Sequence, residues 1–550
     1  MFLRTVNKGN GKQYHYVLRS VRKEGKAHPV HEIVADLTAL PAAVVDVVRG
    51  MLKGSAVQVV AAAAAVVRVK ATLQFAPLWI ALHFWLDLGV RRLPFLSAAD
   101  FVNLTGMVLA RTVNPVECRS EARTAQWLRK SALHLILGGS LRQWDRNAFY
   151  PILGKLSVHW EELEDHLWQQ RTAVPRLYLY DITSTYFEGQ GGSFAALGHS
   201  RDERSGNPQV VIALVADEQG MPIAMRILPG NTKDASTVAA AVSDLKRRFG
   251  VANTVAIMDR GMQGEANIAA LKEAQLDYIM ALPHKQAREF LIARRDRLQW
   301  ELFDERHLAE WTEDGKRYVL CRNPNSAARD HRTRDRIVGR AARRLESLKT
   351  MADKGRIKDR DKILARAVRI LTQAKATKYF TYEVGTGSFR YETTELVKMM
   401  ELYEGCYVLE TTLLEQPAKT EIDQTYRNQR EIEEVFKSCK DELHLRPNFH
   451  KKDDNILGHI RLTFLAHLVK KRLELKLRTA GCFDRGSTFL ARFSDIAVNE
   501  IEVGGEAQPV ITELSPQQRR SADLAGVRIP QGPFAGTLQK LLPKPLQHTI

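Results

Sequence analysis

The sequence has few cysteines, and no two of them have the spacing of a metal-binding or redox motif. The five cysteines stand far apart in a chain of 550 residues, their number is odd, and no CxxC pair occurs. This pattern argues against a disulfide framework and against a cysteine zinc site. It predicts a protein of the reducing cytoplasm.

Long hydrophobic runs are also absent. The most apolar stretch, Ala56–Val67, has twelve residues, whereas about 20 are needed to cross a bilayer. The run Leu78–Val90 is interrupted by His83 and Asp87, and the first residues lack the apolar centre of a signal peptide. We therefore expect buried helices at both runs and no membrane segment.

Several motifs of well-known enzyme classes are missing. The sequence contains no HExxH, GxSxG, Walker or GxGxxG arrangement in a suitable context. Gly189, Gly191 and Gly192 follow an expected strand but lack the Lys-Ser/Thr of a phosphate-binding loop. These three glycines therefore predict a mobile loop and not a phosphate-binding site.

Acidic residues are fewer than basic residues in this chain. The chain has 63 Asp and Glu against 81 Lys and Arg, a formal charge of +18, and residues 321–380 alone carry eighteen basic against six acidic residues. Such a surplus favours a polyanionic partner, with nucleic acid ahead of a membrane surface. We expect a DNA-tracking arm there that includes Arg340, Arg343 and Arg344; the alternative is a helical pair whose charges only face solvent.

The order of the expected elements indicates an α/β fold. From residue 177 to 282, apolar runs and amphipathic segments follow one another as strand, hairpin, helix, strand, helix and strand. The expected strands are 177–182, 210–216, 222–228, 254–258 and 278–282, and the expected helices are 234–249 and 267–274. Beyond them, the pattern predicts two basic helices in 322–378 with a turn at 354–356, a strand at 406–412 and a long helix at 423–442.

Two aspartates stand at the ends of expected buried strands. Asp181 ends the run YLYD and Asp259 ends the run VAIMD. A carboxylate is costly to bury unless it is paired or holds a cation, and ligands of open α/β sheets bind at the carboxyl ends of the strands. Both are candidate metal ligands; the alternative is that each caps the turn or helix that follows.

The helix expected at 423–442 offers a third carboxylate. Tyr426, Glu433 and Lys440 are seven residues apart, and seven residues return to within roughly 20° of the same side of an α-helix. Glu433 and the two aspartates are a set that could hold two divalent cations for phosphodiester chemistry, and oxygen ligands favour Mg²⁺ or Mn²⁺. An ordinary solvated row is the alternative.

Several blocks of the sequence resemble the DDE transposases of bacterial insertion sequences. More narrowly, they resemble the insertion-sequence-four superfamily. That group carries its third acid in a Tyr-(2)-Arg-(3)-Glu-(6)-Lys signature. The resemblance covers roughly residues 177–470. The blocks are YDITSTYFEG (180–189), GHSRDERSGNPQVVIALVADEQGMPIAMRILPGNTKD (198–234), AIMDRGM (256–262) and YRNQREIEEVFKSCK (426–440).

The resemblance implies an RNase H-like mixed-sheet core with a large α/β insertion between the second and third acids, and a mainly helical N-terminal region. It implies that Asp181, Asp259 and Glu433 are catalytic ligands of two Mg²⁺ (or Mn²⁺) ions. The signature arginine is Gln429 in this chain, so Arg427 or Arg430 is expected to replace it unless both are plain surface charges. The expected DNA contacts are Tyr426, Arg427, Arg430, Lys440, Arg260, Arg340, Arg343 and Arg344.

The implied layout has six regions. They are 1–95, a candidate for binding DNA ends; 96–170, helical; 171–285, the first part of the core; 286–400, the insertion with basic helices; 401–475, the second part of the core with the acidic helix; and 476–550, a candidate for dimerisation.

The function that these observations predict is cleavage of the ends of an insertion sequence and their joining to target DNA. The expected partners are double-stranded DNA, as terminal inverted repeats and target, and a second copy of the chain, in the bacterial cytoplasm at the nucleoid. The alternative is a catalytically inactive, sequence-specific DNA-binding protein derived from such an enzyme. A phosphatase of the haloacid dehalogenase type is disfavoured, because Thr183 stands where that class has a second Asp.

Overall fold

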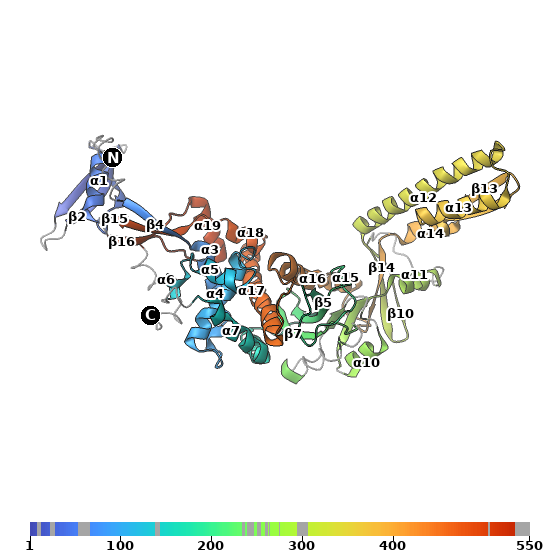
Figure 1. Cartoon of the computed structure of the whole chain (residues 1–550), viewed down its shortest axis with the longest axis horizontal. Helices are drawn as coiled ribbons and strands as arrows, with labels where there is room; N and C mark the ends of the chain where they lie inside the picture. Colours follow the sequence, from blue (N-terminus) through green and yellow to red (C-terminus); the bar gives the residue numbers. More distant parts are fainter. Residues whose placement is uncertain are drawn as a thin grey trace. The chain divides into compact units, whose positions relative to one another are not determined.

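The computed structural model of the chain (Figure 1) divides into two compact units. The first unit comprises residues 1–171, 186–193 and 437–550, and the second comprises 172–185 and 194–436. The described residues are 1–7, 13–22, 28–52, 67–137, 144–233, 237–238, 247–249, 255–258, 262, 264–273, 275–293, 306–503 and 506–533.

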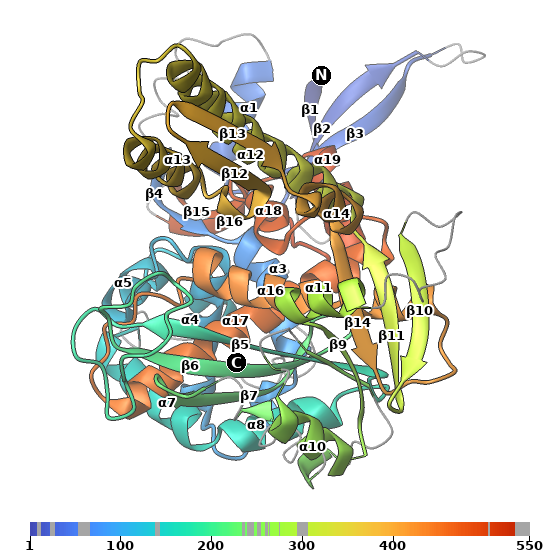
Figure 2. The same ribbon diagram turned by 90° about the vertical axis from the view of Figure 1, so that its right-hand side faces the viewer.

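An eight-stranded mixed sheet forms the centre of the second unit (Figure 2). Its order is β10-β11-β14-β9-β8-β5-β6-β7, with β8 parallel to both β5 and β9. The bounds are β5 Leu177–Tyr186, β6 Gln209–Asp217, β7 Pro222–Pro229, β8 Val255–Met258, β9 Asp277–Ala281, β10 His307–Glu313, β11 Lys316–Arg322 and β14 Cys406–Thr411. The prediction of a mixed α/β fold is therefore confirmed, and the five strands expected between 177 and 282 all form.

Helices cover both faces of this sheet, as the alternation along β11 shows. Tyr318 and Leu320 pack in one apolar cluster with α11 (His284–Ala293). Val319 and Cys321 pack in another with Ile422 of α15 (Lys419–Arg427). Successive residues of a strand point to opposite faces, so α11 and α15 lie on opposite sides of the sheet.

The basic segment after β11 forms a helical arm with its own core, which we call the basic arm (324–403). Its elements are α12 Pro324–Asp353, α13 Arg360–Ala374, β12 Phe380–Gly385, β13 Ser388–Thr393 and α14 Glu395–Tyr403. Leu345 and Leu348 of α12, Ile363 and Leu371 of α13 and Phe389 of β13 are buried together. The two expected basic helices are confirmed, and their turn includes Gly355.

Two sequence predictions about the acids' surroundings are wrong in detail. Asp181 does not end its strand: β5 continues to Tyr186, because the β-branched Ile182, Thr183 and Thr185 favour an extended backbone. The helix expected at 423–442 is not continuous. It is α15, a turn at Asn428, then α16 (Gln429–Lys437) and a π-helical turn from Ser438 to Glu442.

The first unit combines helices with two small sheets. Strands β1 Phe2–Asn7, β2 Gln13–Val21 and β3 Val30–Asp36 form one sheet; β4 Val67–Gln74, β15 Ala497–Val503, β16 Glu506–Ile511 and β17 Gly532–Pro533 form the other. The helices are α1 Ala42–Leu52, α3 Ala76–Leu86, α4 Ala98–Val113, α5 Glu121–Leu128, α6 Leu133–Leu137, α7 Arg146–Val158, α8 Trp160–Gln169, α17 Asp453–Thr479, α18 Gly486–Ala491 and α19 Pro516–Ala525.

The apolar runs noted in the sequence have different outcomes. The expected helix at 78–90 is α3, whose residues are mostly buried. Residues 53–66 and most of 234–249 lie outside the described part of the chain. None of the described helices is long and apolar enough to cross a membrane.

Candidate functional site

Asp181 lies inside β5, directly after the segment that pairs with β8. The register joins Tyr180 to Met258 as the last of four parallel pairs. Asp181 is half-buried, and its Oδ1 atom accepts a hydrogen bond of 2.8 Å from the backbone N–H of Ile182. Asp259 and Arg260 directly follow Met258 in the sequence but lie outside the described residues.

Glu433 lies on the exposed side of a strongly amphipathic helix. Ile432, Val435 and Phe436 of α16 are buried and fix which side faces the interior. Glu433 points away from that side and is exposed. The buried apolar side of α16 therefore leaves this carboxylate open to solvent.

A cavity of about 380 Å³ brings Glu433 together with three other residues expected at the site. Tyr426, Arg427 and Arg430 line the same cavity, so the turn at Asn428 does not separate the phenol from the carboxylate. The beginning of α12, with its N-cap residue Asn323, also lines the cavity. It contributes Asn323, Ser326, Arg329 and Asp330. The lining also includes His284 of α11, Gly405, Cys406, Tyr407 and Gln429. The base of the basic arm and the helix that carries the third acid thus line one cavity.

Arg427 and Arg430 have different surroundings although both line this cavity. The guanidinium of Arg427 pairs with the carboxylate of Asp423, which is 2 % exposed and also accepts a hydrogen bond from the Tyr407 hydroxyl. Burial alone would lower the pKa of Arg427, but the hydrogen bond and the attraction to Asp423 raise it. Arg430 is exposed and makes no hydrogen bond or ion pair within the described residues.

Gln429 occupies the position of the signature arginine and is buried, with 5 % of its surface exposed. A full charge at such a position would need a partner to be tolerated. Gln429 lines the same cavity as Glu433 but carries no charge, and Arg430 is the exposed cation next to it.

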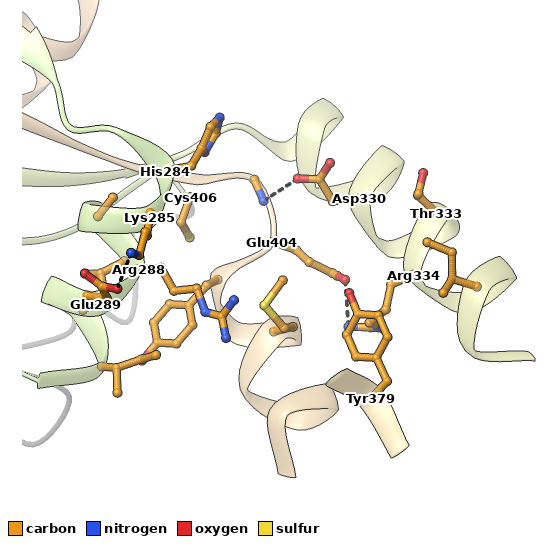
Figure 3. A pocket seen from close by; sticks show the side chains of 17 residues that line it. His284, Lys285, Arg288, Glu289, Asp330, Thr333, Arg334, Tyr379, Glu404 and Cys406 are labelled. Carbon is orange, nitrogen blue, oxygen red and sulfur yellow. Dashed lines mark hydrogen bonds and ion pairs between the residues drawn. The ribbon is translucent and has the colours of Figure 1, made fainter. Parts of the chain in front are cut away.

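A second cavity, of about 660 Å³, lies beside the first and shares His284, Asp330, Gly405 and Cys406 with it (Figure 3). In this cavity Arg334 of α12 pairs with Glu404 at 2.7 Å, and both side chains are almost fully buried. Glu404 lies between α14 and β14. The ion pair therefore ties α12 to the segment that leads from the arm into the sheet.

The three arginines of the basic arm lie on α12 with unequal exposure. Arg340 and Arg343 are exposed, and neither has an ion-pair partner within the described residues. Arg344 is half-buried and donates a hydrogen bond of 2.9 Å to Gln373 of α13. They are not among the residues of the 380 Å³ cavity.

Lys440 lies in the π-helical turn Ser438–Glu442, which belongs to the first unit, and is half-buried. The expected stacking of Tyr426, Glu433 and Lys440 assumed an unbroken α-helix, and a π turn changes the angular spacing.

The cavity residues Arg329, Asp330 and His284 were not predicted from the sequence. Each stands about one hundred residues or more from Glu433 along the chain, so no local pattern could have identified them.

Comparison with known proteins identifies a family for the central half of the chain. Residues 173–469 match the family model described as a transposase DDE domain. This match spans more than half of the chain and includes all three acids expected from the sequence. No match was found among curated proteins.

Two solved structures show distant likenesses. The chain is similar to the piggyBac transposase in a synaptic complex with hairpin DNA, with 9% identity and a TM-score of 0.38, over 76% of this chain and 75% of that one. It is also similar to the Mos1 transposase in a paired-end complex with the left transposon end, with 14% identity and a TM-score of 0.15, over 30% of this chain and 54% of that one. Neither likeness is close enough to support an argument about the site.

Proposed function

The chain belongs to the DDE transposase family, and we propose from this premise that it cleaves the ends of a bacterial insertion sequence and joins them to target DNA. The proposal includes the insertion-sequence-four superfamily, an RNase H-like core and double-stranded DNA as partner. It also includes a homodimer in the DNA complex.

The observation that carries the proposal is the register of β5 and β8. Tyr180 pairs with Met258, and each is followed in the chain by one of the candidate acids, Asp181 and Asp259. The residues that follow two neighbouring parallel strands lie at the same edge of the sheet. Ligands of α/β proteins bind at this edge. A hairpin, β6–β7, next to the parallel strands β5, β8 and β9 supports an RNase H-like core.

The donor set fits magnesium or manganese. Asp181 is half-buried and Glu433 is exposed, so both described carboxylates can be reached from solvent, and carboxylate oxygens are the ligands that hard divalent cations prefer. Asp181, Asp259 and Glu433 would hold two such ions. When bound, two ions activate the attacking oxygen and stabilise the leaving oxygen of an in-line displacement.

The surrounding cations would hold the DNA backbone. Arg430 and Tyr426 line the cavity beside Glu433, and a guanidinium and a phenol are both suited to phosphate contact. Arg340 and Arg343 extend the positive surface along α12. Arg427, held by Asp423, would position α15 and α16 rather than bind DNA.

The test is cleavage of DNA that carries the element's terminal inverted repeats by the purified full-length chain. We expect nicks at the repeat ends with Mg²⁺, no nicks in EDTA, and no cleavage of a duplex with scrambled repeats. Specific binding of the repeats without any metal-dependent cleavage would instead indicate an inactive DNA-binding descendant of a transposase.

A further inference from the structure

A group of two histidines and one glutamate lies in the first unit, apart from the acids of the transposase site. Glu121 is the first residue of α5, His450 lies just before α17, and His459 lies in the second turn of α17. One potential ligand atom from each lies within 4.8 Å of the other two. The imidazole rings of His450 and His459 are 5.2 Å apart and nearly edge-to-face.

The spacing of this group fits a small tetrahedral cation. Two ligands at the usual zinc–nitrogen and zinc–oxygen distances of about 2.1 Å are about 3.4 Å apart when the geometry is tetrahedral. The Nε2 atom of His450 lies 3.5 Å from the Oε1 atom of Glu121. The two groups form an ion pair when His450 is protonated, and the same distance suits two ligands of one ion when it is neutral.

His459 supplies an independent observation. Its side chain is 5 % exposed, yet neither ring nitrogen has a hydrogen-bond partner within the described part of the chain. A buried polar atom without a partner is costly, and such atoms call for a specific explanation. A metal ion between His459, His450 and Glu121 would provide the partner.

The segment that carries His450 is held by backbone contacts before any ion binds. Asn448 is fully buried; its N–H donates to the Tyr186 carbonyl at 3.0 Å, and its carbonyl accepts from the Glu188 N–H at 3.1 Å. The N–H of His450 in turn donates to Asn448 Oδ1 at 2.9 Å. A ligand fixed in this way loses little conformational freedom when it binds an ion.

Arg111 is a cation close to the group, and its guanidinium is already engaged. Arg111 is buried, and its Nη1 atom donates to Thr463 Oγ1 at 2.9 Å. Burial lowers the pKa of Arg111, and the nearby Glu121 carboxylate opposes this shift. The hydrogen bond from Arg111 to Thr463 does not involve either ring nitrogen of His459.

We propose that Glu121, His450 and His459 bind one Zn²⁺ ion, with a water molecule in the fourth position. Two imidazoles and one carboxylate are a typical three-residue zinc set, and they differ from the oxygen-only donors proposed to hold Mg²⁺. The ion would join the N-terminal ends of α5 and α17 and stabilise the first unit. This proposal does not rest on the transposase activity.

The experiment measures zinc on the full-length chain and on matched variants. The protein is stripped with a chelator, incubated with Zn²⁺ and desalted, and its metal content is measured by mass spectrometry. We expect about one Zn²⁺ per wild-type chain and a higher melting temperature in Zn²⁺ than in EDTA. Glu121→Gln, His450→Gln and His459→Leu should each weaken zinc binding at least about tenfold and abolish the rise in melting temperature.

His467→Leu is the matched control. His467 lies on the same helix, is 4 % exposed and, like His459, has no hydrogen-bond partner within the described residues. It is not part of the cluster, so this variant should bind zinc as the wild type does. Substitution of Co²⁺ for Zn²⁺ gives a second readout, because a tetrahedral site produces visible absorption that the three ligand variants should lose.

Two results would overturn the proposal: a wild-type chain that retains no Zn²⁺, or zinc binding that survives all three ligand substitutions. If His459→Leu fails to fold, as judged by circular dichroism, His450→Gln decides, because His450 lies outside the helix and is less buried. DNA cleavage is not used as a readout. A failure of the zinc site and a failure of the proposed transposase function are therefore distinguishable.

Discussion

Tyr180 and Met258 pair across the parallel strands β5 and β8, and they are the last pair of that register. The residues that follow them in the chain are both aspartates, Asp181 and Asp259. The interval of 78 residues between the two acids is therefore the same as the offset between the paired strands. The spacing of the two aspartates in the sequence therefore matches the pairing of β5 with β8.

Removal of any of the three acids should abolish cleavage without abolishing DNA binding. Asp181→Asn, Asp259→Asn and Glu433→Gln keep the shape of each side chain but remove the charge that would hold a divalent ion. We expect Mg²⁺-dependent nicking at background level and end binding close to that of the wild type in gel-shift assays. Glu434→Gln, the exposed neighbour on α16, is the control and should cleave normally. An acid whose variant keeps full cleavage does not belong to the site.

Arg430 and Arg427 should respond to substitution in different ways. Arg430→Gln removes an exposed cation, so DNA affinity should fall and the slope of log affinity against log salt should decrease by about one, while stability is unchanged. Arg427→Gln leaves Asp423 buried without its cation and should destabilise the second unit by about 1–3 kcal/mol. Salt-dependent binding and urea unfolding of both variants separate the two roles. The assignment is reversed if only Arg427→Gln changes the salt slope.

The basic arm should contribute to DNA affinity through charge rather than through specific contacts. Replacing Arg340, Arg343 and Arg344 by Gln should weaken binding of any duplex and reduce the salt slope by about two to three. The arm should stay folded, because its interior is the apolar cluster around Leu345 and Leu371. Arg519→Gln with Arg520→Gln, two exposed cations of α19 in the first unit, is the comparison and should leave the slope unchanged. Equal slopes in the arm variant and the wild type would contradict a role for the arm.

The stability of the first unit should fall with acidification below pH 6.5. Burial, with help from the nearby Lys470 and Lys471, lowers the pKa of His467 well below its ordinary value of 6.5. Below that pH the unfolded chain binds a proton at His467 that the folded chain does not bind. The free energy of unfolding therefore falls by up to about 1.4 kcal/mol for each pH unit below 6.5. His467→Leu should make the pH dependence of urea unfolding shallower. Parallel curves for variant and wild type would show that His467 does not contribute.

Strand β8 could be predicted from its composition alone. The run at 254–258 is almost wholly apolar. This is the pattern expected of a central parallel strand, because both of its faces are covered and its residues do not alternate between polar and apolar. The continuation of β5 beyond Asp181 was missed because Thr183, Ser184 and Thr185 are polar, although all three are buried. The β10–β11 hairpin was missed although Asp314 and Gly315, both with positive φ, form the Asp-Gly pair that favours such a turn.

The candidate site was predictable only in its local parts. The apolar residues Ile432, Val435 and Phe436 of α16 recur at helical spacing and are buried, and helical periodicity is a local property that the sequence shows. The wall formed by Arg329 and Asp330 depends on how α12 leaves the sheet, which is set by long-range contacts such as the Arg334–Glu404 pair. No pattern in the sequence fixes a contact between residues one hundred positions apart.

Two glycines on facing helices of the first unit should differ sharply in their tolerance of alanine. A methyl group on Gly458 of α17 would lie 2.4 Å from the Leu153 carbonyl oxygen of α7, and 2.5 Å from the Leu153 Cα, so the two backbones would have to separate. We expect Gly458→Ala to destabilise the unit by about 2 kcal/mol or more. Gly154→Ala, on α7 itself, meets no atom within 4 Å and should stabilise by up to about 1 kcal/mol, because alanine is the better helix former. Urea unfolding of the two variants measures the difference, and equal effects would show that α7 and α17 do not pack backbone to backbone at Gly458.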